Sequence, residues 1–80
     1  MDHKVAEHVC RVAFRCSREL AELLPFAAAF CESRDHQALL KAVATVTDSI
    51  RTEIMDPLLD SNAGLREQVD ASVETYGVFI

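Results

Sequence analysis

The sequence has few of the residues that make turns and few aromatic residues. Its 80 residues include two glycines, two prolines, one tyrosine and no tryptophan. A β-sandwich needs frequent turns, which glycine and proline supply, so a chain this poor in both is not expected to form one. Alanine, valine and leucine must then provide most of the core, which suits closely packed helices. The scarcity of turn residues therefore predicts an all-α protein.

The sequence also lacks the patterns of disulfide-bonded and membrane-spanning proteins. Its three cysteines show no Cys-x-x-Cys spacing. Cys10 and Cys16, six residues apart on one helix, would point in different directions and could not be bridged. The longest run without a charge, residues 23–31, is too short to cross a bilayer. Charges run through the first 22 residues, so no secretory signal is seen. We expect buried free thiols and a soluble, cytoplasmic protein.

Basic residues are scarce in the last third of the chain. The net charge of −5 argues against nucleic acid as a partner. Residues 1–24 contain four bases and four acids, whereas from Asp48 onward seven acids face only Arg51 and Arg66. The arginine-bearing first segment and the acidic last third are complementary in charge. We expect them to pair, either within one chain or between two.

Residues 35–55 carry the clearest helical pattern. Five apolar residues recur at spacings of four, three, four and four, which places them on one face of an α-helix. Polar residues such as Lys41 and Asp48 occupy the opposite side. A helix of this kind must lay its apolar face on neighbouring segments. The five residues are Leu39, Val43, Val46, Ile50 and Ile54.

Residues 2–24 predict a long first helix with an unusually wide apolar surface. Asp2 can cap it, and three pairs of opposite charge stand four residues apart on its polar side: Glu7–Arg11, Arg15–Glu19 and Arg18–Glu22. A main apolar stripe is widened by further apolar residues until the polar sector is about a third of the circumference. The helix is therefore expected to have at least two neighbours. The main stripe is Val5, Val9, Val12, Cys16, Leu20 and Leu23, and the widening residues include Cys10 and Phe14.

Two prolines mark the expected breaks. Pro25 is expected to stop or kink the first helix, with one or two further turns over residues 26–31. A turn over residues 32–35 would follow, with Ser33 or Asp35 capping the central helix. Asp56 would cap a short helical turn that begins with Pro57.

The last helix is expected to end at Gly77, a residue suited to the left-handed conformation of a helix C-terminus. Its inward-facing residues would be Leu65, Val69, Val73 and Tyr76. Residues 78–80 are Val-Phe-Ile, an apolar tail that we expect to dock on the core of its own chain or on a partner.

Three short patterns suggest chemistry. His3 with Glu7, and Glu32 with His36, have the i,i+4 spacing of metal ligands in helical bundles. Asp48-Ser49-Ile50 resembles the phosphopantetheine attachment triplet of acyl carrier proteins, and this resemblance implies a carrier modified at Ser49. His36, on a helix surface, is a residue type that phosphotransfer bundles use. Ser49 lies within a strong helical pattern without a preceding glycine, and no inward-facing Glu or His occurs on the central helix.

These observations together predict one helical domain over residues 1–80, an up-down-up bundle of three helices with short connectors that is completed by dimerisation. We expect no enzymatic activity, no cofactor and no metal. A protein-interaction or regulatory module is favoured, with a carrier or phosphotransfer protein, or a metal- or small-ligand-binding bundle, as alternatives. The apolar surface of the first helix and the tail are predicted to form the homodimer interface through Val5, Val9, Cys10, Val12, Phe14, Cys16, Phe79 and Ile80.

Overall fold

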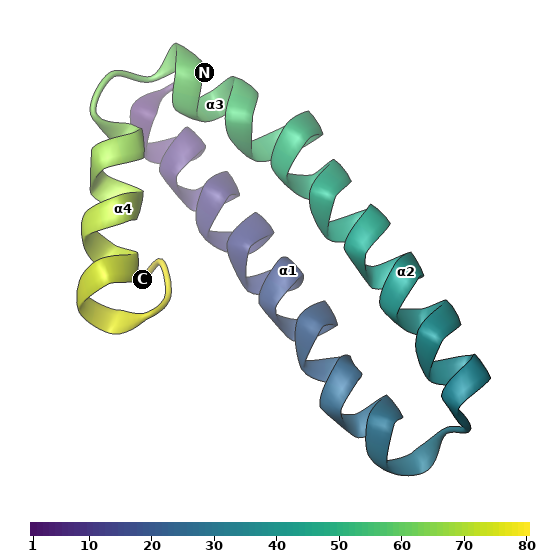
Figure 1. Ribbon diagram of the computed structural model, residues 1–80. Coiled ribbons are helices and arrows are strands. Elements are labelled where there is room, and N and C mark those ends of the chain that lie inside the picture. Colours follow the sequence, from purple (N-terminus) through teal and green to yellow (C-terminus); the bar gives the residue numbers. More distant parts are fainter.

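A long helical hairpin forms most of the molecule (Figure 1). In the computed structural model, which describes residues 1–80, the first leg is helix α1 (His3–Phe30). The return leg joins three segments end to end: α2 (Ser33–Ser49), the π-helix η1 (Ile50–Met55) and α3 (Asp56–Ser61). Helix α4 (Leu65–Tyr76) is the third leg. The prediction of an all-α, three-helix, up-down-up fold is confirmed.

Helix α1 continues through Pro25, so a helix stop at this proline is not found. Proline has no N–H to donate to the carbonyl of Ala21, but Ala21 and Pro25 are exposed and water can solvate that carbonyl. Ala27, two residues further on, is 1% exposed against the return leg, and its packing favours the helical continuation. The turn between the legs is shorter than predicted, because only Cys31 and Glu32 separate α1 from α2.

Two of the predicted helix caps are wrong. Glu32 occupies the cap position of α2 without a side-chain hydrogen bond, so neither Ser33 nor Asp35 serves as the cap. The return leg runs through Asp56 in helical conformation, and the Asp56 carboxylate lies 3.4 Å from the guanidinium of Arg51 instead of capping α3. At the start of α1, the predicted cap is present: the backbone N–H of Lys4 donates to the Asp2 carboxylate at 3.2 Å.

The π-helix η1 is a feature that apolar spacing alone did not predict. Threonine hydroxyls donate to carbonyls one turn earlier, from Thr47 to Val43 at 2.8 Å and from Thr52 to Asp48 at 3.0 Å. Such bonds compete with the backbone ladder and loosen it. Arg51 lies 2.6 Å from Asp48 and also contacts Asp56, so one side chain spans the π segment.

Small side chains bring the two legs of the hairpin together. Ala6, Ala13, Leu20 and Ala27 recur every seven residues along α1, and the three alanines are buried. A seven-residue repeat keeps one seam of a helix facing its neighbour. On the return leg the buried residues are Val43 and Met55.

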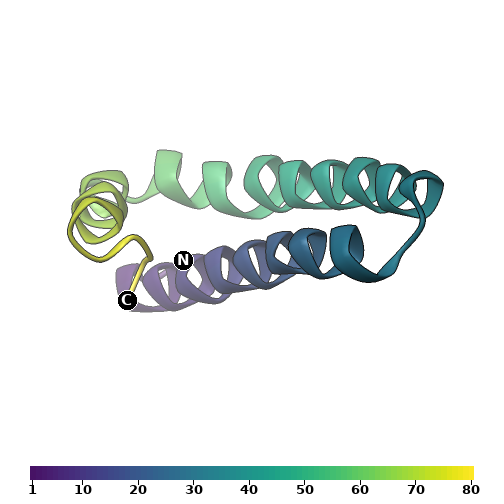
Figure 2. The same cartoon turned by 60° about the horizontal axis from the view of Figure 1, so that its bottom comes forward.

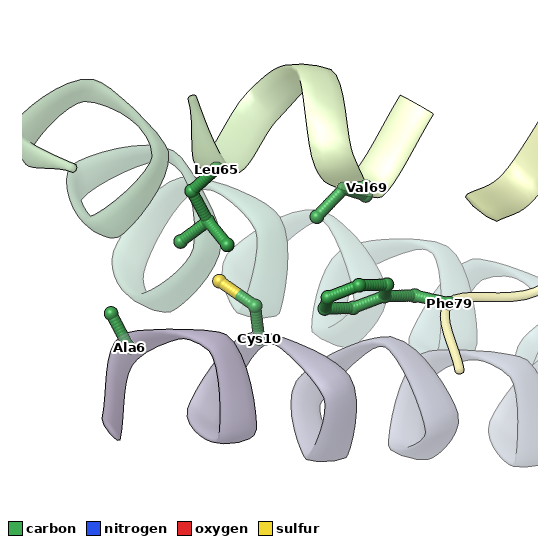
Figure 3. Close-up of a cluster of buried hydrophobic side chains, with 5 residues drawn as sticks. All are labelled: Ala6, Cys10, Leu65, Val69 and Phe79. Carbon is green, nitrogen blue, oxygen red and sulfur yellow. The ribbon is translucent and has the colours of Figure 1, made fainter. Parts of the chain in front are cut away.

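The main core lies at one end of the hairpin, where α4 and the tail fold onto α1 (Figure 3). Gly64 and Gly77 bound α4 with φ of +82° and +76°, and the predicted left-handed C-terminus at Gly77 is confirmed. The tail docks on its own chain: the hydroxyl of Ser72 donates to the carbonyl of Val78 at 3.0 Å and accepts from the N–H of Ile80 at 3.1 Å. The core residues are Ala6, Cys10, Leu65, Val69 and Phe79. Tyr76, predicted to face inward, is 63% exposed.

The molecule is elongated and covers little of its apolar surface. Its extents are 45 × 25 × 15 Å and its radius of gyration is 14.6 Å, whereas a compact domain of this length has about 11.6 Å. Only ten of 80 residues are buried. Figure 2 shows the two legs lying side by side as a single layer, with α4 at one end only. None of the helices has the length and apolar character needed to cross a membrane.

Candidate interaction surface

An apolar groove runs between α1 and the π segment on the side of the hairpin away from the core. It encloses about 340 Å³ and is lined by Val9, Val12 and Cys16 of α1 and by Ile50 and Ile54 of η1, with Ala13 as its floor and His8 at its edge. Each of the five lining residues belongs to an apolar stripe seen in the sequence. The groove therefore arises where the stripe of the first helix and the stripe of the central helix meet side by side.

The groove continues in both directions along the hairpin. A second hollow beside it is formed by Cys16, Leu20 and Leu23, together with Glu19. Val5 precedes Val9 by one helical turn, and Val46 precedes Ile50 by one turn. Large fractions of these side chains are exposed: 51% of Val5, 43% of Leu23, 48% of Val46 and 42% of Ile54. We call this surface the open face: Val5, Val9, Val12, Cys16, Leu20 and Leu23 of α1, with Val46, Ile50 and Ile54 of the return leg.

The spacing of the open face is that of helices that pack in bundles. On α1 its residues 5, 9, 12 and 16 alternate by four, three and four, and the stripe of the return leg over residues 39, 43, 46 and 50 does the same. This alternation produces a straight seam that accepts the side chains of a facing helix. Helix α4 and the tail do not cover it, because they pack on the flank of α1 that carries Cys10 and Phe14. Phe14 lies about 160° around the helix from Val12.

The residues predicted to form the interface lie in three different parts of the structure. Val5, Val9, Val12 and Cys16 lie together on the open face. Cys10 is 0% exposed and Phe79 is 4% exposed, so both belong to the core of the subunit itself. Phe14 and Ile80 line a separate pocket between α1 and the tail.

Sequence reasoning missed the contribution of the return leg to this surface. Val46, Ile50 and Ile54 were predicted to pack within the chain, but Val46 and Ile54 are nearly half exposed. No signal in the sequence indicated this, because the five apolar residues of the central helix lie on one face, which a single neighbouring helix could cover. The legs meet through alanines on α1 and bury only Val43 and Met55 of the return leg, so much of both stripes stays uncovered.

A second pocket, of about 290 Å³, lies between α1 and the docked tail. We call it the arginine pocket. Arg11 is held in place on its wall: its guanidinium donates to the Glu7 carboxylate at 2.8 Å and to the carbonyl of Ile80 at 3.3 Å, and it lies over the Phe79 ring. The hydrogen bond from Arg11 lowers the pKa of the Glu7 carboxyl below its usual value. The pocket is lined by Arg11, Phe14, Arg15, Arg18, Val78, Phe79 and Ile80.

Ion pairs in the structure are local. Glu7–Arg11 and Arg18–Glu22 form as predicted, at 2.8 and 3.4 Å, but Arg15 and Glu19 do not pair. In the acidic last third, Arg51 and Arg66 pair with nearby aspartates. No ion pair joins the arginines of α1 to the acidic last third, so the predicted pairing does not occur within one chain.

The histidines and Ser49 do not gather into one site. Nε2 of His3 lies 3.3 Å from the side-chain oxygen of Gln68, and Glu7 is engaged by Arg11. His36 is half-buried in the first turns of α2, and Ser49 is exposed at its end. No group of three or more His, Cys, Asp or Glu side chains is placed to hold a metal ion.

The three thiols are free and differ in their surroundings. Cys10 is buried, and its burial raises the pKa of the thiol. Cys16 and Cys31 are exposed, so the expectation of buried thiols is wrong for these two. Cys16 lies on the open face and Cys31 lies at the far tip of the hairpin, between α1 and α2.

Comparison with known proteins adds no family to this description. No protein-family model, no curated protein and no solved structure shows significant similarity to the chain.

Proposed function

We propose that the protein is a non-enzymatic interaction module that forms a homodimer through the open face. The observation that supports this most strongly is the continuous apolar surface over α1, α2 and η1, whose side chains are up to half exposed. Contiguous apolar surfaces of this kind mark protein interaction sites in water-soluble proteins. Dimerisation and the interaction role are both proposals.

The exposed area of the subunit fits this proposal. A monomeric protein of 8.9 kDa exposes about 4,800 Å² by the usual scaling of surface with mass. This chain exposes 5547 Å², which is about 700 Å² more. A standard interface buries about 800 Å² on each partner. The excess surface of one subunit is therefore close to what one side of a stable dimer covers.

A second copy is the partner that the geometry favours. Two-fold dimers use the same patch on both subunits, which places apolar side chains against apolar side chains without requiring a different protein. Two hairpins that meet through their open faces make a four-helix bundle, in which each helix packs along two seams. The arginines of α1 and the acids of the last third, which do not pair with one another within the chain, are then available to pair between copies.

Sedimentation equilibrium of the wild type and three variants tests the proposal. The wild type is expected to be a dimer, and Val46→Glu, which places a charge on the open face, is expected to be a folded monomer. Val12→Glu, on the opposite wall of the groove, should behave in the same way. Leu40→Glu is the matched control, because Leu40 is 40% exposed, lies about 120° around the helix from Val46 and should leave the dimer intact.

Circular dichroism on the same samples separates loss of the dimer from loss of the fold. Val46→Glu replaces a side chain that is already half exposed, so the variant should keep the helical circular dichroism signal of the wild type at high protein concentration. A wild type that stays monomeric over the whole concentration range would refute the homodimer. Dissociation by Leu40→Glu to the same extent as Val46→Glu would show that the open face is not the interface.

The carrier and phosphotransfer alternatives at Ser49 and His36 remain predictions with a separate test. Intact-mass measurement after expression beside a phosphopantetheinyl transferase would detect a carrier modification at Ser49. Incubation with a phosphodonor followed by mass measurement at neutral pH would detect a phosphohistidine. Our proposal expects an unmodified chain in both experiments.

A further inference from the structure

We propose that the arginine pocket binds a small carboxylic acid that carries a short apolar chain. The pocket has an apolar wall made by Phe14 and the docked tail, and a basic rim made by three arginines of α1. An apolar cavity with a few convergent polar groups is the usual form of a small-molecule site. The charged side chains that line the pocket are all arginines.

The ion pairs and hydrogen bonds that the three arginines already form indicate where the carboxylate would bind. Arg11 already donates to Glu7 and to the carbonyl of Ile80. Arg18 contacts Glu22 at 3.4 Å, with both side chains more than half exposed. Arg15 has no ion-pair partner, since the expected pair with Glu19 does not form. Arg15 is therefore the primary donor, and Arg18 can turn to assist it.

The chemistry of the rim favours a monoanionic carboxylate. A guanidinium presents two parallel N–H donors that match the two oxygens of a carboxylate. One unpaired arginine balances a single negative charge. A phosphate dianion would require further unpaired donors, whereas Arg11 is held by Glu7 and Arg18 contacts Glu22.

The size of the pocket limits the apolar part of the ligand. A volume of about 290 Å³ lies at the lower end of the range for ligand pockets and equals roughly ten water volumes. A chain of about eight carbon atoms fits such a space, whereas a long-chain lipid would extend far outside it. Phe14 and the Phe79 ring, which also contacts Arg11, would line the apolar chain.

This site is separate from the proposed dimer interface. The lining residues of the arginine pocket and of the groove on the open face have none in common. Binding of a carboxylic acid therefore does not depend on dimerisation, and either proposal can fail without the other.

An NMR titration with sodium octanoate tests this site. Amide resonances of residues 11–18 and 78–80 are expected to shift saturably, and those of α2 are expected to stay unchanged. Octylamine has the same chain with the opposite charge and should cause no saturable shift. 1-Octanol, which has no charge, should bind at least about tenfold more weakly, since a charge-assisted hydrogen bond contributes roughly that factor.

Variants identify the arginine that binds. Arg15→Gln is expected to weaken octanoate binding about tenfold, and Arg15→Lys, which keeps the charge but loses the paired donors, should lie between Gln and the wild type. Arg34→Gln is the control, because Arg34 is an exposed arginine of α2 outside the pocket. Equal affinity for octanoate and octanol, or unchanged binding by Arg15→Gln, would overturn the proposal. Shifts centred on the open face would overturn it as well.

Discussion

The guanidinium of Arg11 lies over the ring of Phe79, with its central carbon 4.8 Å from the ring centroid. Sixty-eight positions separate the two residues in the sequence, and their contact fastens the tail to the first helix. Beneath the guanidinium the Phe79 ring packs with Cys10 and Val69 (Figure 3). Phe79 therefore acts together with Leu65 and Val69 of α4 to hold α4 and the tail against α1.

Phe79→Ala should destabilise the protein by about 3–5 kcal/mol, the usual cost of removing a buried phenylalanine. The ring is 4% exposed and belongs to the main core with Cys10 and Val69. Urea unfolding followed by circular dichroism measures the effect. Tyr76→Ala, at a position 63% exposed, is the control and should change stability by less than about 0.5 kcal/mol. Equal effects of the two substitutions would show that the tail does not dock as described.

Lowering the pH should reduce the free energy of unfolding, because it protonates Glu7 and removes its ion pair with Arg11. The pKa of the Glu7 carboxyl is lowered in the folded protein by its hydrogen bond from Arg11. The folded state therefore binds fewer protons than the unfolded state near the usual glutamate pKa of about 4.3. The stabilisation is present above that pH and is lost as the pH falls through the lowered value.

Urea unfolding of the wild type and Glu7→Gln from pH 7 to pH 3 measures this loss. The wild type should be the more stable protein at neutral pH, and the difference should shrink as the pH falls. A difference that stays constant over the whole range would contradict a role for the charge of Glu7.

The three thiols should react at different rates with a chromogenic disulfide reagent. Cys31, exposed at the tip of the hairpin, should react fastest, whereas Cys10 should react only when the protein unfolds, since it is buried and its pKa is raised by burial. Cys16 reports on the open face: its rate should fall as protein concentration rises, while the rate of Cys31 stays constant. Rapid reaction of Cys10 in the native protein would contradict the position of α4.

Pro25→Ala should stabilise the protein, by up to about 3 kcal/mol. Proline at this interior position of α1 leaves a carbonyl of the preceding turn without its helical partner, and alanine restores the hydrogen bond. The midpoint of thermal unfolding should rise. An unchanged or lower midpoint would indicate that the helix bends at Pro25 in solution.

The sequence predicts the main helices and their apolar stripes because helical periodicity is a local property. The cap at Asp2 and the left-handed helix end at Gly77 were also predictable, since each depends on only a few neighbouring residues. The continuation of α1 past Pro25 was not, because it depends on the packing of Ala27 against the other leg. The π segment was not predicted either, because its apolar spacing is that of an ordinary α-helix and does not show the side-chain bonds of Arg51 and Thr52 to Asp48.

The candidate site was predicted only in part, for a geometric reason. The wide apolar surface of α1 serves two different neighbours, and periodicity alone does not say which residues face which one. Cys10 and Phe79 face the core of the subunit, whereas Val12 and Cys16 face outward. The position of α4 decides this division, because α4 and the tail pack together on the flank of α1 that carries Cys10.

Isotope-filtered NMR on a mixture of labelled and unlabelled chains tests the proposed dimer most directly. It detects contacts between methyl groups of two different copies. Intermolecular contacts are expected between methyl groups of Val9 or Val12 on one copy and those of Val46, Ile50 or Ile54 on the other. Intermolecular contacts confined to Val69, Val78 and Ile80, or none at concentrations up to about 1 mM, would contradict a dimer formed through the open face.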